Sequence, residues 1–145
     1  MDPVNVLLVE DNPGDVVLVR EAVAEAGLAY RLTVVRDGVE AMDRLSGKGQ
    51  SAGSPLPDLI LLDLNLPRKT GLELLAEILA DPILYQVPVV LLSSSRSELD
   101  KARAYALPPD RCLVKPGTFA EYVKLMHNVE AARQQALASR GGQEA

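Results

Sequence analysis

Short apolar runs alternate with amphipathic stretches along most of this chain, and that alternation constrains the fold more than any other feature. Residues 4–9 are almost wholly apolar, which is typical of a parallel strand covered on both faces. Further strands are expected at residues 31–35, 59–62, 87–92 and 111–114. Between and after them, the spacing of apolar residues predicts helices at residues 15–26, 37–45, 71–80, 97–107 and from Thr118 onwards.

Local signals support these boundaries. Gly27 follows the first helix, at the position where a helix end favours a positive φ. Asp37 and Glu40 have the spacing of a capping box at the start of the second helix. Residues 46–57 are rich in glycine and proline, and we interpret them as a surface loop because the alternation resumes directly afterwards.

Five strands that alternate with five helices predict an α/β fold, a doubly wound parallel sheet with helices on both faces. The length of 145 residues suits one domain. We expect that domain over residues 1–130, followed at 131–145 by an extension of the last helix and a polar tail, with no effector domain.

The composition excludes several classes of function. The formal net charge of −5 argues against a protein that binds nucleic acid or anionic membranes, because such proteins carry basic patches. No apolar run approaches the ~20 residues of a membrane span, and the first residues lack the pattern of a signal peptide. The single cysteine, Cys112, has no partner for an internal disulfide. We therefore expect a cytoplasmic protein.

Polar side chains follow four of the five predicted strands. In chain order these are Glu10 and Asp11, then Asp63 with Asn65, then Ser93, and finally Lys115. In a parallel sheet the carboxyl ends of the strands meet at one edge, where ligands bind. A lone aspartate at such an end is more often a helix cap, but the agreement of four ends favours a site. Clustered carboxylates suit Mg²⁺, and the chemistry they favour is phosphoryl transfer to or from a carboxylate.

The same stretches resemble the receiver domain of two-component response regulators, over roughly residues 3–130. The stretches that carry the resemblance are residues 6–12, 59–67, 88–93 and 114–116. Residues 10–15 and 64–67 are also similar to the small single-domain regulators that are paired with bacterial phytochrome kinases. The resemblance implies the flavodoxin-like strand order 2-1-3-4-5 and a histidine kinase as partner, with phytochromes as the candidates.

The resemblance also implies roles for the strand-end residues. Asp63 corresponds to the nucleophile that takes a phosphoryl group from a kinase histidine. Asp11, Asp63 and the backbone carbonyl of Asn65 correspond to Mg²⁺ ligands, and Glu10 to a residue that acts through a bound water. The ion would neutralise the attacking carboxylate and the incoming oxygens. Such a protein catalyses its own phosphorylation and slow dephosphorylation, and is not a turnover enzyme.

The resemblance gives Lys115 a catalytic role and makes Ser93 and Cys112 the positions of the signalling switch. Lys115 supplies a point charge to the phosphoryl group. Ser93 matches the hydroxyl that moves to bond a phosphoryl oxygen and draws the loop after the fourth strand with it. The family's aromatic switch residue is replaced by Cys112, which has no ring to rotate, so either the backbone of that loop or another aromatic such as Tyr105 would transmit the signal.

Other functions remain open at this stage. A Mg²⁺-dependent phosphohydrolase would need an acid two residues after the nucleophile, where this chain has Asn65. A nucleotide-binding fold would need a glycine-rich phosphate cradle after the first strand, which here is acidic. The principal alternative is an interaction module on a receiver fold that signals without phosphate, favoured by Cys112 and by the long final helix.

The final helix carries an apolar stripe over about five turns, of which packing on the sheet is expected to use about three. The members of the stripe are Phe119, Tyr122, Val123, Met126, Val129, Ala132, Ala136 and Leu137. The surplus predicts a surface for self-association, and we expect a homodimer.

Overall fold

A computed structural model describes residues 2–47, 55–102, 107–108 and 111–144. It contains a five-stranded parallel sheet in the order β2-β1-β3-β4-β5, as expected. The strands are β1 (Val4–Val9), β2 (Tyr30–Val35), β3 (Leu59–Asp63), β4 (Val89–Ser93) and β5 (Cys112–Val114). The helices are α1 (Pro13–Glu25), α2 (Gly38–Leu45), α3 (Gly71–Ala80), α4 (Arg96–Ala102) and α5 (Phe119–Glu144), with a 3-10 turn η2 (Leu84–Gln86) before β4.

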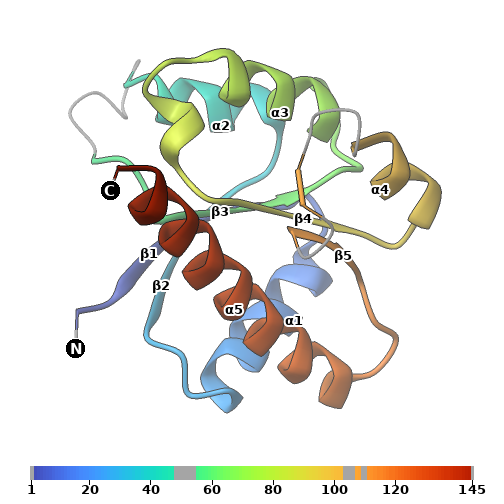
Figure 1. Ribbon diagram of the computed structural model, residues 1–145. Coiled ribbons are helices and arrows are strands. Elements are labelled where there is room, and N and C mark those ends of the chain that lie inside the picture. Colours follow the sequence, from blue (N-terminus) through green and yellow to red (C-terminus); the bar gives the residue numbers. More distant parts are fainter. Residues whose placement is uncertain (1, 48–54, 103–106, 109–110, 145) are drawn as a thin grey trace.

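Helices cover both faces of the sheet (Figure 1). α2, α3 and α4 pack on one face over a core that includes Leu7, Ile60 and Leu91, and α1 and α5 pack on the other over a core that includes Leu8 and Leu61. Alternate residues of each strand therefore serve opposite cores. Because both faces are covered, β3 and β4 are buried along their whole length, which explains their continuous apolar sequences.

Two helices differ from their expected bounds. α1 begins at Pro13 rather than Asp15, because Asn12 caps it by accepting from the backbone N–H groups of Gly14 and Asp15, and proline suits the first helical position. α4 covers Arg96–Ala102, and the rest of its expected range falls partly outside the described residues. Two local signals are confirmed, since Gly27 has a φ of 71° and Asp37 caps α2, although the Glu40 side chain accepts from the N–H of Arg36 rather than of Asp37. Most of the loop expected at residues 46–57 lies outside the described residues.

α5 runs without a break past residue 130 and lies across the sheet (Figure 1). Phe119, the first member of its stripe, is 41% exposed, but burial within the chain extends from Tyr122 as far as Ala136, which is 4% exposed. The expectation that packing uses only three turns is therefore wrong, because the helix continues over the body of the domain. Leu137, at the end of the stripe, is 36% exposed.

A polar network fastens the second half of α5 to the start of β2. Tyr30 donates to Glu130 Oε1 at 2.7 Å, and Arg133 donates to both oxygens of Glu130 at 2.9 and 2.8 Å. The bonds from Arg133 are the main reason that the pKa of Glu130 falls to about 2. The bidentate pair within α5 holds Glu130 in place, and the Tyr30 bond to Glu130 ties the helix to the sheet at the end opposite the strand-end acids.

No helix among the described residues is both long enough and apolar enough to cross a bilayer.

Candidate functional site

All of the predicted strand-end residues except Ser93 line a polar cavity of about 360 Å³ at the carboxyl edge of the sheet. Its lining consists of Glu10, Asp11, Asn12, Asp15, Asp63, Asn65, Ser94, Lys115, Pro116 and Tyr122. Five different segments of the chain therefore meet at this cavity, which we call the acidic cleft.

Strand register brings the two buried acids of the cleft together. Val9 is level with Leu62, so Glu10 and Asp63, which follow them, lie side by side. Alternation along the strands turns both side chains toward the α1–α5 face. Carboxylate oxygens of Glu10, Asp11 and Asp63 all lie within 4.8 Å of one another, so these three residues can together hold a metal ion. Asp11 is exposed, and the other two are buried.

Lys115 reaches into the cleft from the end of β5 and is the cation at its centre. Its Nζ donates to Glu10 Oε1 at 2.7 Å, to Asp15 Oδ2 at 2.9 Å and to Asp63 Oδ2 at 3.1 Å. The lysine is placed there by β5, whose pairing with β4 continues as a bond from the Lys115 N–H to the Ser93 carbonyl at 2.9 Å. One ammonium thus forms ion pairs with three carboxylates.

These contacts shift the ionisation of both partners. Burial opposes the charge of Lys115, but the carboxylates of Glu10, Asp15 and Asp63 outweigh it and raise the pKa of the lysine. Burial, followed by the hydrogen bond and charge of Asp63, raises the pKa of Glu10 to about 7 against the opposing effect of Lys115. The cleft therefore has more negative charge than its one lysine neutralises, and this favours an added cation.

Asn65 and Ser93 are placed differently with respect to the cleft. Asn65 lines it, and its backbone N–H donates to Asp63 Oδ1 at 3.2 Å. Ser93 is 2% exposed and does not line the cleft, whereas Ser94 does. The Ser93 hydroxyl instead accepts from the backbone N–H of Ser95 at 3.0 Å. Its role as a switch hydroxyl stays a prediction.

Cys112 lies in β5, level with Leu91 of β4. It is partly buried and packs against the core on the α2–α4 face, opposite the face that Lys115 serves. Its role in the switch also stays a prediction. Tyr105, the other aromatic considered for this role, lies outside the described residues.

Sequence reasoning missed one charged and one aromatic residue of the cleft. Asp15 was expected at the start of α1, but because the helix begins at Pro13, Asp15 sits within its first turn and contacts Lys115. Tyr122 was assigned only to the apolar stripe of α5. It is 3% exposed, and burial, then the charge of Asp15, raises the pKa of its hydroxyl. The available signal for Asp15 was Asn12 followed by Pro13, a cap and first-turn pair that moves the start of α1 two residues earlier.

A close backbone approach positions Asp63. Gly71 begins α3, and its N–H donates to the Leu64 carbonyl at 3.1 Å. A Cβ on Gly71 would lie 2.4 Å from Leu64 Cα and 2.7 Å from the Asp63 carbonyl oxygen. Only glycine allows α3 to start this close to the end of β3. Thr70, just before it, caps the helix by accepting from the Glu73 N–H at 3.2 Å.

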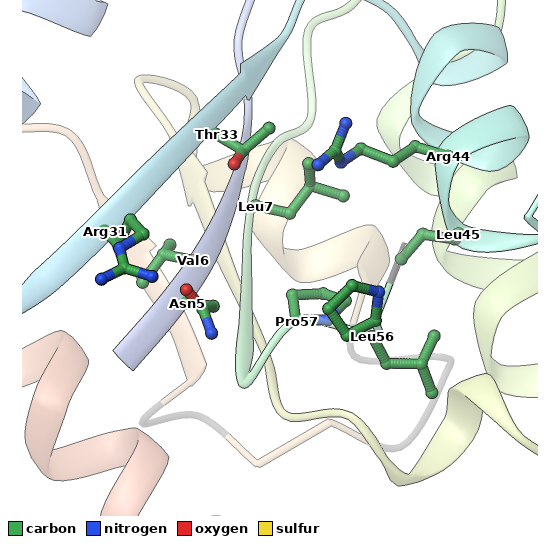
Figure 2. A pocket seen from close by; sticks show the side chains of 10 residues that line it. Asn5, Val6, Leu7, Arg31, Thr33, Arg44, Leu45, Leu56 and Pro57 are labelled. Atoms are coloured by element: carbon green, nitrogen blue, oxygen red, sulfur yellow. The ribbon is translucent and has the colours of Figure 1, made fainter. Parts of the chain in front are cut away.

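A second cavity, of about 260 Å³, lies away from the acidic cleft (Figure 2). It is formed by the first halves of β1 and β2, the end of α2 and residues 55–57. Leu7, Leu45 and Leu56 supply apolar walls, and Arg31 and Arg44 supply the charged groups. None of the described residues that line it is a carboxylate, so it does not share the chemistry of the acidic cleft.

The fold and the acidic cleft together define a class of protein. Residues 6–127 match the response regulator receiver domain family, and the chain belongs to that family. The chain is 40% identical over 129 residues to the response regulator Rcp1 of Synechocystis sp., a match that covers 89% of this chain and 88% of the relative.

Two solved structures extend the comparison. The phosphorylated cyanobacterial phytochrome response regulator RcpA is 40% identical, with a TM-score of 0.76 over 89% of this chain and 92% of that one. The Mn²⁺-bound form of Rcp1 is 38% identical, with a TM-score of 0.75 over 89% of this chain and 93% of that one. This chain is thus a receiver homologous to phytochrome response regulators, and its family implies phosphorylation-based signalling with a histidine kinase as partner.

Proposed function

We propose that this protein is a phosphoacceptor response regulator that takes a phosphoryl group from a histidine kinase onto Asp63. The observation that carries the proposal is the convergence of Lys115, Glu10 and Asp63 within hydrogen-bonding distance at a buried strand end, with Asp11 beside them. The Asp63 side chain is 7% exposed, so the reacting carboxylate is shielded but opens onto the cleft.

The transfer is a substitution at phosphorus. A carboxylate oxygen of Asp63 forms a bond to phosphorus while the bond from phosphorus to the kinase imidazole nitrogen breaks, and that nitrogen keeps the electron pair. The Asn65 N–H on Oδ1 orients the carboxylate, and Lys115, which donates to Asp63 Oδ2, lies close enough to bond an incoming phosphoryl oxygen. The product is an acyl phosphate whose negative charge Lys115 partly balances.

Mg²⁺ is the cation that we propose for the cleft. The oxygen-only donor set of Glu10, Asp11 and Asp63 fits a hard divalent ion, with Glu10 acting through water and the Asn65 carbonyl as a further ligand. When bound, such an ion neutralises the carboxylates and the incoming phosphoryl oxygens. The Mn²⁺-bound form of Rcp1 supports a divalent ion in this family.

We further propose a phytochrome histidine kinase as the partner and the cytoplasm as the place of transfer. Support comes from RcpA, whose description names it a phytochrome response regulator. Ser93 and Cys112, which both belong to the α2–α4 side of the sheet end, are the proposed switch positions. Residues 1–130 would form the receiver unit, with 131–145 as the extension of α5.

Intact-mass measurement after incubation with acetyl phosphate and Mg²⁺ tests the acceptor. We expect one added phosphoryl group on the wild type and none on Asp63→Asn. Asp43→Asn, which makes the same change at an exposed position on α2, is the matched control and is expected to be phosphorylated like the wild type. An adduct on Asp63→Asn, or a wild type that neither forms an adduct nor binds beryllium fluoride, would overturn the proposal and favour the phosphate-independent module.

The expected homodimer is also proposed, on a surface that includes only Leu137 of the apolar stripe. Ile83, Tyr85 and Leu137 are 64%, 56% and 36% exposed, and Ile83 and Leu137 line one shallow cavity together. Exposed apolar groups that gather beside one helix are typical of association surfaces. Sedimentation equilibrium is expected to show a dimer for the wild type and a weaker one for Ile83→Lys. A monomeric wild type at all concentrations would contradict this proposal.

A further inference from the structure

All three N–H donors of the Lys115 ammonium form hydrogen bonds in this structure. A lysine side chain carries three N–H groups, and all three are directed to carboxylates, those of Glu10, Asp15 and Asp63. A phosphoryl group on Asp63 that is to be bonded by Lys115 must therefore take the place of one of these partners. The three carboxylates compete with the incoming group for the same donor.

The three partners differ in how easily they can be released. The Glu10 side chain is 2% exposed, so without the lysine it would be a buried carboxylate with little access to water. Asp63 is 7% exposed and is itself the group that becomes phosphorylated. The Asp15 side chain is 26% exposed. Water can replace the lysine at Asp15 more readily than at either of the other two.

Asp15 would also remain stabilised after release. It lies in the first turn of α1, where the helix macrodipole favours a negative charge, and its own backbone N–H is bonded to the Asn12 cap. The structure thus favours the Lys115–Asp15 ion pair as the one that breaks when a phosphoryl group arrives.

We infer that Asp15 is a positioning residue that occupies one N–H donor of Lys115 until Asp63 is modified. It thereby stabilises the unphosphorylated state relative to the phosphorylated one. This inference rests on the proposed function of Asp63. It makes Asp15 a competitor of the phosphoryl group rather than a supporter of it. Removal of its charge should therefore favour the phosphorylated state.

The sign of this effect separates the inference from a merely structural role. If Asp15 only kept the cleft in shape, Asp15→Asn would weaken the binding of a phosphoryl mimic. If it competes for Lys115, the same change strengthens that binding. We expect an affinity for beryllium fluoride about threefold to tenfold higher than that of the wild type, the range for one partly exposed ion pair.

The measurement is calorimetric titration of beryllium fluoride at saturating Mg²⁺, so that the cation site is filled in every variant. Glu21→Gln removes one negative charge from an exposed position on the same helix and corrects for the general change in potential. Asp15→Ser serves as a second variant in case Asp15→Asn does not fold, as judged by circular dichroism.

Each outcome has one meaning. Tighter binding by the Asp15 variants, but not by Glu21→Gln, supports the inference. Equal or weaker binding by Asp15→Asn and Asp15→Ser, with an intact wild-type response, overturns it and leaves the role of Asp63 standing. A wild type that binds no beryllium fluoride and accepts no phosphoryl group removes the proposed function itself.

Discussion

Replacement of Lys115 by methionine is expected to lower the free energy of unfolding by about 3 kcal/mol near neutral pH in the absence of divalent cations, the range for removing one partner of a buried ion pair. Methionine keeps most of the side-chain volume, so the loss comes from charge. Without the ammonium, the carboxylates of Glu10, Asp15 and Asp63 face one another unbalanced. The deficit should shrink as the pH falls, because loss of the ammonium removes a contact that lowers the pKa of Glu10 and this carboxyl then takes up a proton more readily.

Mg²⁺ should reverse most of this loss. The ion replaces the missing positive charge, and because it binds the folded state it adds stability by mass action. We expect its affinity to rise about tenfold in Lys115→Met, since the repulsion between ion and ammonium is gone. Urea titrations with and without Mg²⁺ measure both effects, and Lys101→Met, which removes a lysine that is 64% exposed, is the control. If Lys115→Met and the wild type had equal free energies of unfolding without metal, the lysine would not offset the negative charge of the cleft.

Substitution of Gly71 by alanine is the second large expected effect. The added Cβ would meet the backbone of Leu64 and Asp63, and neither contact can be relieved by a side-chain rotation. We expect a loss of roughly 3 kcal/mol in the free energy of unfolding, as for overpacking against backbone. Because the displaced peptide belongs to Asp63, phosphorylation by acetyl phosphate should fall more steeply than stability alone explains.

Gly117→Ala is the matched control for this substitution. Gly117 lies between Lys115 and α5, but a Cβ there would meet no atom within 4 Å. The free energy of unfolding of Gly117→Ala should differ from that of the wild type by less than about 1 kcal/mol, and any difference should be an increase. If Gly71→Ala behaved like Gly117→Ala in urea titration and in phosphorylation, the close approach of α3 to β3 would have no functional consequence.

The parts of the cleft that could be predicted are those set by strand periodicity. Glu10, Asp63 and Lys115 each end an apolar run, and in a parallel sheet such ends meet at one edge. Their placement on one face follows from the alternation of side chains along each strand. These features depend only on local sequence and on the pairing of strands, so the sequence alone suffices for them.

The parts that could not be predicted depend on how helices lie over the sheet. Asp15 reaches Lys115 because α1 begins two residues before its expected start, and capping by Asn12 was the deciding contact. Most of the apolar stripe of α5 is buried within the domain because the helix lies across the sheet over a longer distance than expected. Helical spacing in the sequence does not specify this arrangement. The close approach at Gly71 is equally invisible in the sequence, where a glycine at a helix start has many explanations.

β5 has a consequence for local unfolding. It is three residues long and stands last in the strand order, so few backbone bonds hold it to the sheet. Edge segments of this kind open at a lower free energy than the core does. Lys115 follows β5 directly, and its three ion pairs exist only while the strand is in place. Occupancy of the acidic cleft and hydrogen exchange at this edge are therefore linked equilibria, and a ligand that binds only the closed form protects the amides of β5.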